Sequence, residues 1–264
     1  MAKLNQVLSC FIPEGPLKET LKSCYYSAYY NRKHFKENGF RVHYMSGHFE
    51  YSFDKGIRFG SHENMADELK RSLKGYLKKY SLKPGDTVID CGAYVGEFTL
   101  YAARAVGPSG RVIAFEPDAG IYARLLRNIK LNGFNNVTAV NKGLWSEDGV
   151  LKFVGDGVKG YSFMLGGDDP SAVDVPVASL DSELARLKVA RVNFIKADVE
   201  GAEVELLRGA AKTLSPGLAA VAVASYHMLG GRKSYFEVEE VLSRMGYDSE
   251  TGHPGHLTTY AWRK

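Results

Sequence analysis

The chain has 264 residues, of which 45% are hydrophobic, 24% charged and 12% aromatic. This composition is that of a globular protein with a full core, and it excludes collagen-like chains, repeat arrays and small disulfide scaffolds. The longest apolar run, GLAAVAVAS at residues 217–225, is far shorter than the ~20 residues of a membrane-spanning helix. Three cysteines without a CxxC pair predict neither a disulfide framework nor a zinc knuckle, and we expect a soluble, cytoplasmic protein.

The net charge of +4 is unevenly distributed along the chain. Residues 1–83 hold 15 Lys and Arg against 8 Asp and Glu, together with half of the 16 tyrosines, whereas residues 84–264 hold 19 against 22. Basic and aromatic residues in one segment are typical of a surface for an anionic partner, nucleic acid included. No nucleic-acid-binding motif accompanies them, so a solvated helical face above packed tyrosines is the simpler interpretation.

Residues 1–80 are predicted to form an extension, because they hold too few apolar residues for a sizeable core of their own. The alternation in Phe40–Tyr44 and Phe49–Phe53, around Ser46 and Gly47, predicts a β-hairpin. An amphipathic helix is expected from Ser61 to the Lys-Pro-Gly stop at residues 83–85. Its apolar residues recur every four positions, at Met65, Leu69, Leu73 and Leu77. We expect this extension to cap the acceptor side of the domain that follows.

Residues 81–264 alternate short apolar runs with helical patterns, which predicts an α/β fold with a doubly wound, Rossmann-like sheet that is mostly parallel. The expected strands are Thr87–Cys91, Arg111–Phe115, Val137–Asn141, Val192–Ala197, Leu218–Ala224 and His256–Trp262. The expected helices are Gly96–Ala105, Gly120–Leu131, Leu180–Leu187, Ala202–Leu214 and Phe236–Met245. Val150–Val154 and Val173–Val177 read as an inserted ribbon, and the Gly- and Asp-rich stretch Gly155–Asp169 between them as a mobile loop over the acceptor.

The first motif, Thr87–Thr99 (TVIDCGAYVGEFT), places an acid at the end of a buried strand, a glycine loop and a helix start in succession. Gly92 and Gly96 allow the backbone to approach a ligand, and the helix N-terminus offers free N–H groups to an anion. Dinucleotide sites use a related turn. Asp90, however, is placed to accept a hydrogen bond from a ligand ammonium, so a ligand with both an amine and a carboxylate fits best.

The second motif ends the next strand with Glu116, about twenty residues after the glycine loop. A carboxylate at this position can accept both ribose hydroxyls of an adenosine. A helix-capping or surface carboxylate is the alternative. An amino acid joined to an adenosine is S-adenosylmethionine.

The third motif is Phe194–Glu203 (FIKADVEGAE), in which Asp198 and Glu200 follow a hydrophobic strand at the edge where ligands bind in open α/β sheets. Glu203 and Glu205 are expected to be carboxylates of the first helical turn, which the helix dipole favours. His227 follows the strand Leu218–Ala224 at the same edge and is either structural or functional.

Three further features leave alternatives open. The turn at Lys142 and Gly143 is expected near the adenine, and Trp145 is either a base contact or an anchor of the ribbon. His253 and His256 are spaced like a turn, and a metal site there would need a nearby carboxylate such as Asp198. Cys91 is expected to be a small packed side chain.

Together these motifs resemble the FkbM family of S-adenosylmethionine-dependent methyltransferases. The family patterns D-x-G-A-x-x-G, F-E-P, K-x-D-V-E-G-x-E and L-x-G-A are matched by Asp90–Gly96, Phe115–Pro117, Lys196–Glu203 and Leu207–Ala210. The family commonly has Asn at the position of Tyr94. The resemblance covers roughly residues 83–264 and implies a seven-stranded class I methyltransferase sheet that methylates a hydroxyl in a sugar or natural product.

The site prediction combines the motifs with this resemblance. The predicted cofactor-binding residues are Asp90, Gly92, Ala93, Tyr94, Gly96, Thr99, Glu116, Pro117, Lys142, Gly143 and Asp198. The predicted catalytic residues are His227, Asp198 and Glu200, and no metal site is assigned. His227 is expected to act as the base, with a pH step near the ~6.5 of an ordinary imidazole, while Asp198 positions the cofactor or orients the ring.

The expected partner is a small-molecule or glycan acceptor, and the sequence does not name it or the oligomeric state. An RNA methyltransferase that uses the basic N-terminal third is one alternative. A nicotinamide-dependent oxidoreductase is a second, against which the Asp198–Gly201 strand end argues. A binding module that senses the cofactor without turnover is a third.

Overall fold

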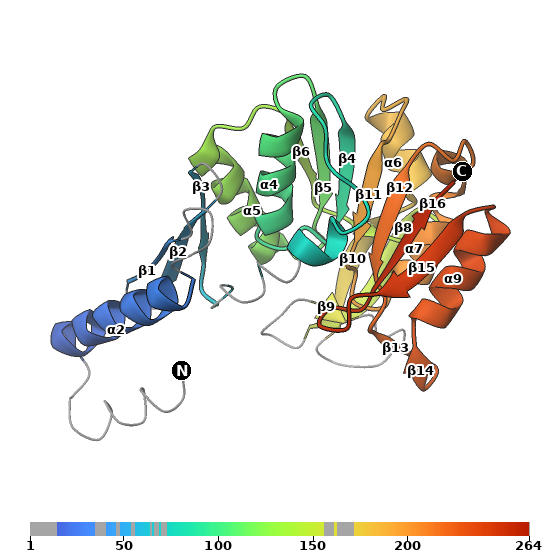
Figure 1. The fold of residues 1–264 in the computed structure, drawn as a ribbon. Helices are drawn as coiled ribbons and strands as arrows, with labels where there is room; N and C mark the ends of the chain where they lie inside the picture. The colour runs from blue at the N-terminus through green and yellow to red at the C-terminus, as the bar shows by residue number, and fades with distance from the viewer. Residues whose placement is uncertain are drawn as a thin grey trace. The chain divides into compact units, whose positions relative to one another are not determined.

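The computed structural model describes residues 15–34, 41–45, 48–53, 56–63, 65, 69, 73–155, 161–162 and 172–263. The chain divides into two compact units, Met1–Glu68 and Leu69–Lys264 (Figure 1). The boundary therefore falls earlier than residue 80. Residues 73–80 belong with the second unit because Leu73, Leu77 and Tyr80 pack against its core.

The first unit pairs helix α2 (Pro16–His34) with a three-stranded antiparallel sheet of β1 (Arg41–Met45), β2 (His48–Phe53) and β3 (Ile57–Ser61). The predicted hairpin is confirmed as β1 and β2, and β3 adds a strand that was not predicted. Aromatic residues on α2 and β2 form its core, among them Tyr26, Tyr30 and Phe49, all at most 6% exposed. Tyr25 and Tyr29 are about half exposed, so α2 has both packed and solvated tyrosines.

Polar side chains of α2 bind the backbone of β1. The Asn31 amide donates to the Val42 carbonyl at 2.8 Å and accepts the Val42 N–H at 2.8 Å. The Ser27 hydroxyl accepts the Tyr44 N–H at 3.0 Å. The helix is thereby fixed along the outer side of the sheet.

The helix predicted to start at Ser61 is wrong at its N-terminus. Ser61 ends β3, and its hydroxyl accepts the Glu63 N–H at 3.1 Å in a local turn, so the chain does not enter a helix there. Residues 73–76 of the second unit are helical, as expected. Ser61 belongs to a strand because Ile57, Phe59 and Ser61 are alternate residues that are all buried in the first unit.

The second unit is a seven-stranded sheet in the order β15-β16-β12-β11-β4-β5-β6, with helices on both faces (Figure 1). Its strands are β4 (Thr87–Cys91), β5 (Arg111–Phe115), β6 (Val137–Val140), β11 (Phe194–Ala197), β12 (Ala220–Ala224), β15 (Asp248–Gly252) and β16 (Thr258–Trp262). Only β16 runs against its neighbours. The predicted fold class is confirmed, because β4, β5, β6, β11 and β12 are mutually parallel.

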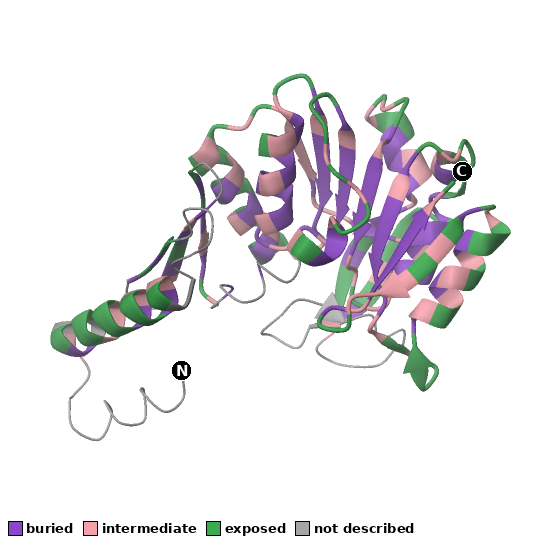
Figure 2. Ribbon diagram, in the orientation of Figure 1, coloured by how far each residue is buried: buried purple, intermediate pink, exposed green. Residues whose placement is uncertain are grey.

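Successive residues of each central strand face opposite layers. Val88, Val112 and Phe194 pack with α4 (Glu97–Val106), and Ala114 packs with α5 (Ala119–Asn132). Ile89, Ile113 and Ile195 face the other layer, which holds α6 (Leu180–Arg186), α7 (Glu203–Arg208), α8 (Ala211–Leu214) and α9 (Tyr235–Arg244). Figure 2 shows the strands of this sheet as mostly buried.

The helix predicted at Ala202–Leu214 is two helices, α7 and α8. They are separated at Gly209, where a Cβ atom would lie 2.0 Å from the Trp145 carbonyl oxygen. The close approach of another segment therefore interrupts the helix. Strand β15 was not predicted, because its sequence DSETG is polar and exposed or half-buried along its length.

The inserted ribbon is confirmed as β8 (Gly149–Gly155) paired with β10 (Val173–Ala178), in a side sheet that also contains β7 (Gly143–Leu144) and β9 (Tyr161–Ser162). Trp145 packs against the buried core of this ribbon, which favours its role as an anchor. The predicted mobile loop lies outside the described residues, apart from Gly155 and β9. A short hairpin of β13 (Met228–Leu229) and β14 (Arg232–Lys233) precedes α9.

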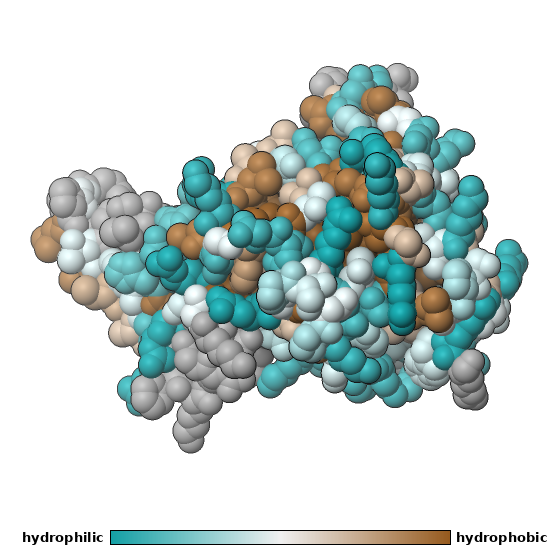
Figure 3. Space-filling model, turned by 90° about the horizontal axis from the view of Figure 1, so that it is seen from above, coloured by the Kyte–Doolittle hydropathy of each residue, from teal (hydrophilic) through white to brown (hydrophobic). Residues whose placement is uncertain are grey.

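Hydrophilic side chains predominate on the face seen in Figure 3, with apolar ones in small groups between them. Of the helices within the described residues, none has both the length and the apolar character needed to cross a bilayer.

Candidate active site

Four loops meet at one edge of the central sheet because β5, β4, β11 and β12 are parallel neighbours. The loops begin after Phe115, Cys91, Ala197 and Ala224. Ligands of open α/β sheets bind at this carboxyl edge. The three sequence motifs and His227 all lie there, as predicted.

The loop after β4 comes very close to the end of β11. The Asp198 N–H donates to the Cys91 carbonyl at 3.0 Å. Gly92 has φ +75°, and a Cβ atom there would lie 1.8 Å from the Asp198 carbonyl oxygen. At Gly96, with φ +99°, a Cβ atom would lie 2.7 Å from a Leu125 methyl carbon. Both positions require glycine.

Asp90 is engaged within the protein, and its predicted hydrogen bond to a ligand ammonium stays a prediction. The side chain is completely buried, and its Oδ2 accepts the Thr99 hydroxyl at 2.5 Å. Its Oδ1 lies 3.0 Å from Nζ of Lys196, the residue beside it on β11. Thr99 is likewise buried and bonded to Asp90. Both residues therefore support the loop from within the protein.

Lys196 connects Asp90 to the backbone of the glycine loop. Its ammonium donates to the Gly92 carbonyl at 2.6 Å and to the Cys91 carbonyl at 3.2 Å. Burial opposes the charged form, but the nearby carboxylates of Asp90, Asp198 and Glu97 raise the pKa of Lys196 above its usual value. A charged lysine thus holds the loop backbone in place.

Glu97 is a buried carboxyl at the first position of α4 that the sequence analysis did not single out. Burial raises its pKa to about 8, although Lys196 acts in the opposite direction. Among the described residues, its Oε2 has no hydrogen-bond partner. At neutral pH this group is therefore mostly neutral.

Glu116 directly follows β5 at the carboxyl edge of the sheet, as predicted, and is 6% exposed. Its Oε2 accepts the Tyr94 N–H at 2.9 Å and its Oε1 accepts the Asp118 N–H at 2.9 Å. Burial raises the pKa of Glu116 to about 7, and these two hydrogen bonds only partly compensate. The backbone of Pro117 is held by the Asn141 amide, which donates to its carbonyl at 2.9 Å.

Tyr94 adopts φ 50°, a left-handed conformation that is unusual for a residue other than glycine. This conformation directs the Tyr94 N–H at Glu116. The hydrogen bond to Glu116 is made by the backbone N–H, so it does not depend on whether position 94 holds Tyr or Asn. The neighbouring Ala93 is buried.

The Lys142 side chain is engaged elsewhere. Its Nζ lies 2.6 Å from Oε1 of Glu183 on α6, and Glu183 also binds Arg186. Gly143 is buried at the start of β7. The predicted contact of this turn with the adenine base stays a prediction.

Asp198 lies at the centre of a set of polar side chains. Its Oδ2 accepts the Tyr76 hydroxyl at 2.7 Å, and the Tyr226 hydroxyl lies 3.2 Å from its Oδ1. His256 Nε2 is 3.2 Å from the Tyr76 oxygen and 4.0 Å from Asp198 Oδ2. Burial and the nearby Asp198 raise the pKa of Tyr76 well above its usual value, so the phenol stays a hydrogen-bond donor.

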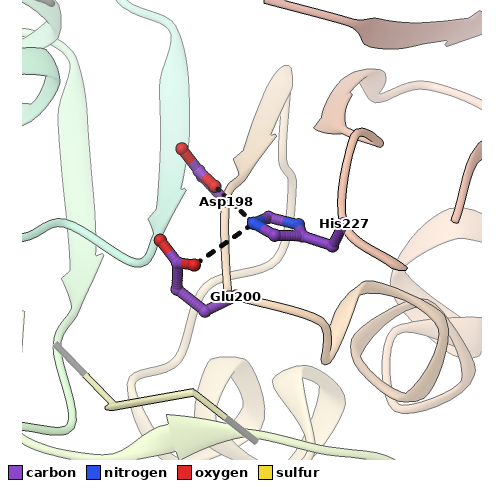
Figure 4. Close-up of side chains that lie close together, drawn as sticks. All are labelled: Asp198, Glu200 and His227. Carbon is purple, nitrogen blue, oxygen red and sulfur yellow. Dashed lines mark ion pairs between the residues drawn. The ribbon is translucent and has the colours of Figure 1, made fainter. Parts of the chain in front are cut away.

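His227 faces three carboxylates, of which Figure 4 shows Asp198 and Glu200. Its Nε2 lies 3.3 Å from Glu200 Oε2 and 3.9 Å from Asp198 Oδ1, and its Nδ1 lies 2.9 Å from Glu203 Oε1. Glu203 is fully buried and also accepts the N–H groups of Val199 and Gly201 at 3.2 Å. It is in the first turn of α7, as predicted, and it fixes the turn that carries Glu200.

The predicted pH step near the ordinary imidazole value is wrong for this environment. Burial alone would lower the pKa of His227, but the carboxylates of Glu200, Glu203 and Asp198 outweigh it and raise the pKa to about 10. The ring is therefore an imidazolium at neutral pH in the protein alone. A neutral imidazole base is scarce under these conditions.

Tyr76 was missed because it comes from a distant part of the chain, whereas His256 was considered beside Asp198 as part of a possible metal site. Tyr76 precedes the sheet, and His256 lies in the turn closed by its own N–H to the His253 carbonyl at 2.9 Å. The turn itself was predicted. Tyr226, next to His227 in the sequence, was the one signal that could have been used.

The comparisons agree with this geometry. A family model described as the methyltransferase FkbM domain matches residues 90–249, more than half of the chain. The chain belongs to the FkbM methyltransferase family. This identification confirms the resemblance of the motifs in β4, β5 and β11.

Two curated relatives and one solved structure define the extent of the similarity. The protein "Methyltransferase 1" of Beauveria bassiana is 32% identical over 148 residues, which are 48% of this chain and 59% of that protein. "Methyltransferase sdnD" of Sordaria araneosa is 28% identical over 193 residues, 61% of this chain and 73% of that protein. The crystal structure of methyltransferase FkbM from Methylobacillus flagellatus KT matches with a TM-score of 0.50 and 21% identity, over 67% of this chain and 44% of that chain.

The FkbM segment covers the glycine loop, Glu116 and the His227 cluster. Tyr76 and His256, which contact Asp198 or its partner, lie outside it. The chain spans 59% of the length of one of these relatives and 44% of the solved structure. The structural likeness supports the class I methyltransferase fold.

Proposed function

We propose that this chain transfers a methyl group from S-adenosylmethionine to a hydroxyl group of a sugar, glycan or natural-product acceptor. The observation that carries the proposal is the meeting of two features at one edge of the sheet. One is Glu116 beside the glycine loop, and the other is the cluster of His227 with Asp198 and Glu200. Family membership supports the same conclusion.

The Glu116 carboxylate fits the ribose of the cofactor. Each of its oxygens accepts one backbone N–H, from Tyr94 or Asp118. A carboxylate has about four acceptor positions, so each oxygen keeps one for a ribose hydroxyl. The two backbone hydrogen bonds also fix the plane of the carboxylate before a ligand arrives.

The glycine loop fits the amino-acid end of the cofactor through its backbone. Gly92 and Gly96 let the loop pack closely against Asp198 and Leu125, and α4 begins directly after Gly96 with first-turn N–H groups that have no partner within the helix. Asp90 and Lys196 hold this backbone in place from beneath. The loop is thus supported before binding, which lowers the cost of ordering it.

When bound, S-adenosylmethionine supplies an electrophilic methyl group on a positively charged sulfur. The acceptor hydroxyl loses its proton as the new bond to carbon forms, and a positioned group that receives this proton accelerates transfer by ~10²–10⁴-fold. Because His227 is already protonated at neutral pH, a carboxylate of the cluster receives the proton. Glu200 is the most accessible, with half of its side chain exposed.

The test is product analysis by mass spectrometry with methyl-labelled cofactor. The full chain is incubated with panels of sugars, natural-product alcohols, lipids and RNA, and Glu200→Gln is compared with Glu240→Gln, an exposed acid on α9. We expect label on a hydroxyl of a small molecule or glycan, and a rate at least about tenfold lower for Glu200→Gln only.

Label found in RNA would replace the proposed acceptor class. Absence of calorimetric binding of the cofactor or its demethylated product would overturn the proposal as a whole.

A further inference from the structure

Asp198, Glu200 and His227 present one ligand atom each toward a common point. The three atoms lie within 4.8 Å of one another, and Figure 4 shows both carboxylates directed at the ring. Glu200 reaches this position because its backbone is left-handed, with φ 53°. Such a conformation costs about 1–3 kcal/mol outside glycine and is concentrated at functional sites.

The histidine of the cluster is oriented from behind. Nδ1 lies 2.9 Å from the completely buried carboxylate of Glu203, while Nε2 is directed toward Glu200 and Asp198. The carboxylate on Nδ1 fixes the orientation of the ring, so that Nε2 faces the other two carboxylates, and a cation that binds there displaces the Nε2 proton. This is the usual arrangement around histidines that bind a metal.

The cluster also has an excess of negative charge. Three carboxylates surround one imidazole, and throughout the part of the chain that the structure describes their ion pairs are all with histidine. Asp198 accepts hydrogen bonds from uncharged tyrosines, and the nearby Lys196 ammonium is already paired with Asp90. A divalent cation would balance this excess.

The spacing suits such a cation after a small contraction. A six-coordinate cation with ligands at ~2.1 Å holds neighbouring ligand atoms ~3 Å apart. The Nε2 distances of 3.3 Å to Glu200 and 3.9 Å to Asp198 are close to that value. Glu200 is half exposed and free to adjust, whereas His227 and Asp198 are held by Glu203 and Tyr76.

We propose that Asp198, Glu200 and His227 bind one divalent cation, with Glu203 as the positioning residue. Two carboxylates favour Mg²⁺ or Mn²⁺, and the imidazole favours a transition metal, so Mn²⁺ satisfies the whole set. The remaining coordination positions take water or the acceptor hydroxyl. A hydroxyl on a cation loses its proton more readily, and the second oxygen of Glu200 is available to receive it. This catalytic use rests on the proposed function, whereas the binding of the cation does not.

The binding test uses Mn²⁺ as the probe and the full, metal-free chain. Free Mn²⁺ is followed by electron paramagnetic resonance during a titration, and Mg²⁺ is then added as a competitor. We expect one saturable site per chain. Glu200→Gln and His227→Gln should each weaken binding by at least tenfold, and Glu240→Gln by less than twofold. Circular dichroism establishes that each variant is folded, and the half-exposed Glu200 keeps the test decisive should His227→Gln fail to fold.

Mn²⁺ binding that does not saturate, or that is equal in all variants, would overturn the cation site. Calorimetric binding of S-adenosylmethionine to the metal-free chain is measured separately. If that cofactor binds and the acceptor is methylated at full rate without a cation, the function stands and the cation's catalytic role fails. If Mn²⁺ binds at the predicted residues and the cofactor does not, the proposed function fails and the cation site stands.

Discussion

Glu116 is buried and yet carries a carboxyl whose pKa is about 7. The charged groups around it are the Asp118 carboxylate, which raises the pKa, and the Lys196 ammonium, which lowers it. Two backbone N–H groups stabilise the ionised form. Its protonation therefore changes within the range in which enzymes are usually assayed.

We expect cofactor affinity to fall as the pH drops below about 7. Ribose hydroxyls donate to the ionised carboxylate, so binding lowers the Glu116 pKa and releases a proton wherever the free protein holds one. The loss approaches tenfold per pH unit below the free-protein pKa and vanishes above it. Isothermal titration calorimetry at pH 8, 7 and 6 measures this slope.

Glu116→Gln is the control for that slope, because the titration of the ligand's own amine is common to both proteins. The variant should bind at least about tenfold more weakly at pH 8, which corresponds to ~1.4 kcal/mol. Its additional loss between pH 7 and 6 should be absent. Equal slopes in the two proteins would show that Glu116 does not contact the cofactor.

Asp90 and Lys196 form a buried ion pair, and replacing one partner alone should lower the free energy of unfolding. Lys196→Met leaves the Asp90 carboxylate buried without its cation and the Cys91 and Gly92 carbonyls without a donor. Breaking such a pair typically costs ~3–5 kcal/mol of unfolding free energy. Urea denaturation of Lys196→Met, Asp90→Asn and the double variant measures it.

The double variant should lose markedly less stability than the two single losses added together, because each single change leaves one partner uncompensated. Additive losses would mean that the two side chains do not interact.

At the scale of elements, the site depends on how closely two loops approach. The β4 loop and the end of β11 leave no room for a side chain at Gly92, since a Cβ atom there would meet the Asp198 carbonyl oxygen at 1.8 Å. Neither backbone can move alone, because the Asp198 N–H is bonded to the Cys91 carbonyl. Displacement of one loop thus displaces the cluster on the other.

Gly92→Ala should therefore destabilise the chain by several kcal/mol, whereas Gly133→Ala should cost only about 1–2 kcal/mol. Both glycines have positive φ, +75° and +64°, but a Cβ atom at Gly133 would meet nothing within 4 Å. The shared backbone strain is ~1–2 kcal/mol for any L residue. Chemical denaturation of the two variants separates this strain from the close contact, and equal losses would contradict the contact.

The sequence predicted those elements whose bounds depend on neighbouring residues, and it failed where a remote segment sets the bound. β4 and β5 have their predicted bounds, because each is a short buried run with glycine, proline or charged residues around it. α7 and α8 were merged because the interruption at Gly209 comes from Trp145, which is remote in sequence. Residues within the motifs were likewise found, while Tyr76, a partner of Asp198, lies 122 residues away from it and gives no local signal.

At the scale of the whole molecule, the two units have separate cores. The first is built of aromatic residues from α2 and its small sheet, and the second surrounds the seven-stranded sheet. All the residues proposed to bind the cofactor belong to the second unit. We propose that the first unit contributes to selection of the acceptor.

Removal of residues 1–68 should leave cofactor affinity within about twofold while abolishing turnover of the native acceptor. The ribose and loop contacts remain, since they come from Leu69–Lys264. Calorimetry and labelled-product analysis measure the two effects on one preparation, with circular dichroism as the check on folding. A truncated chain that methylates its acceptor at full rate would show that the first unit is dispensable.

The hydrogen bonds from Asn31 and Ser27 to β1 also bear on the solubility of the newly made chain. β1 is an outer strand, and its exposed backbone groups are a template for pairing with a second molecule. α2 occupies several of those groups, and it precedes β1 in the order of synthesis. Asn31 precedes Val42 by 11 residues, so at ~5–20 residues per second the helix leaves the ribosome about 0.5–2 s before the strand that it covers. The helix that covers the edge strand is thus synthesised before the strand, which limits pairing of β1 with a second molecule.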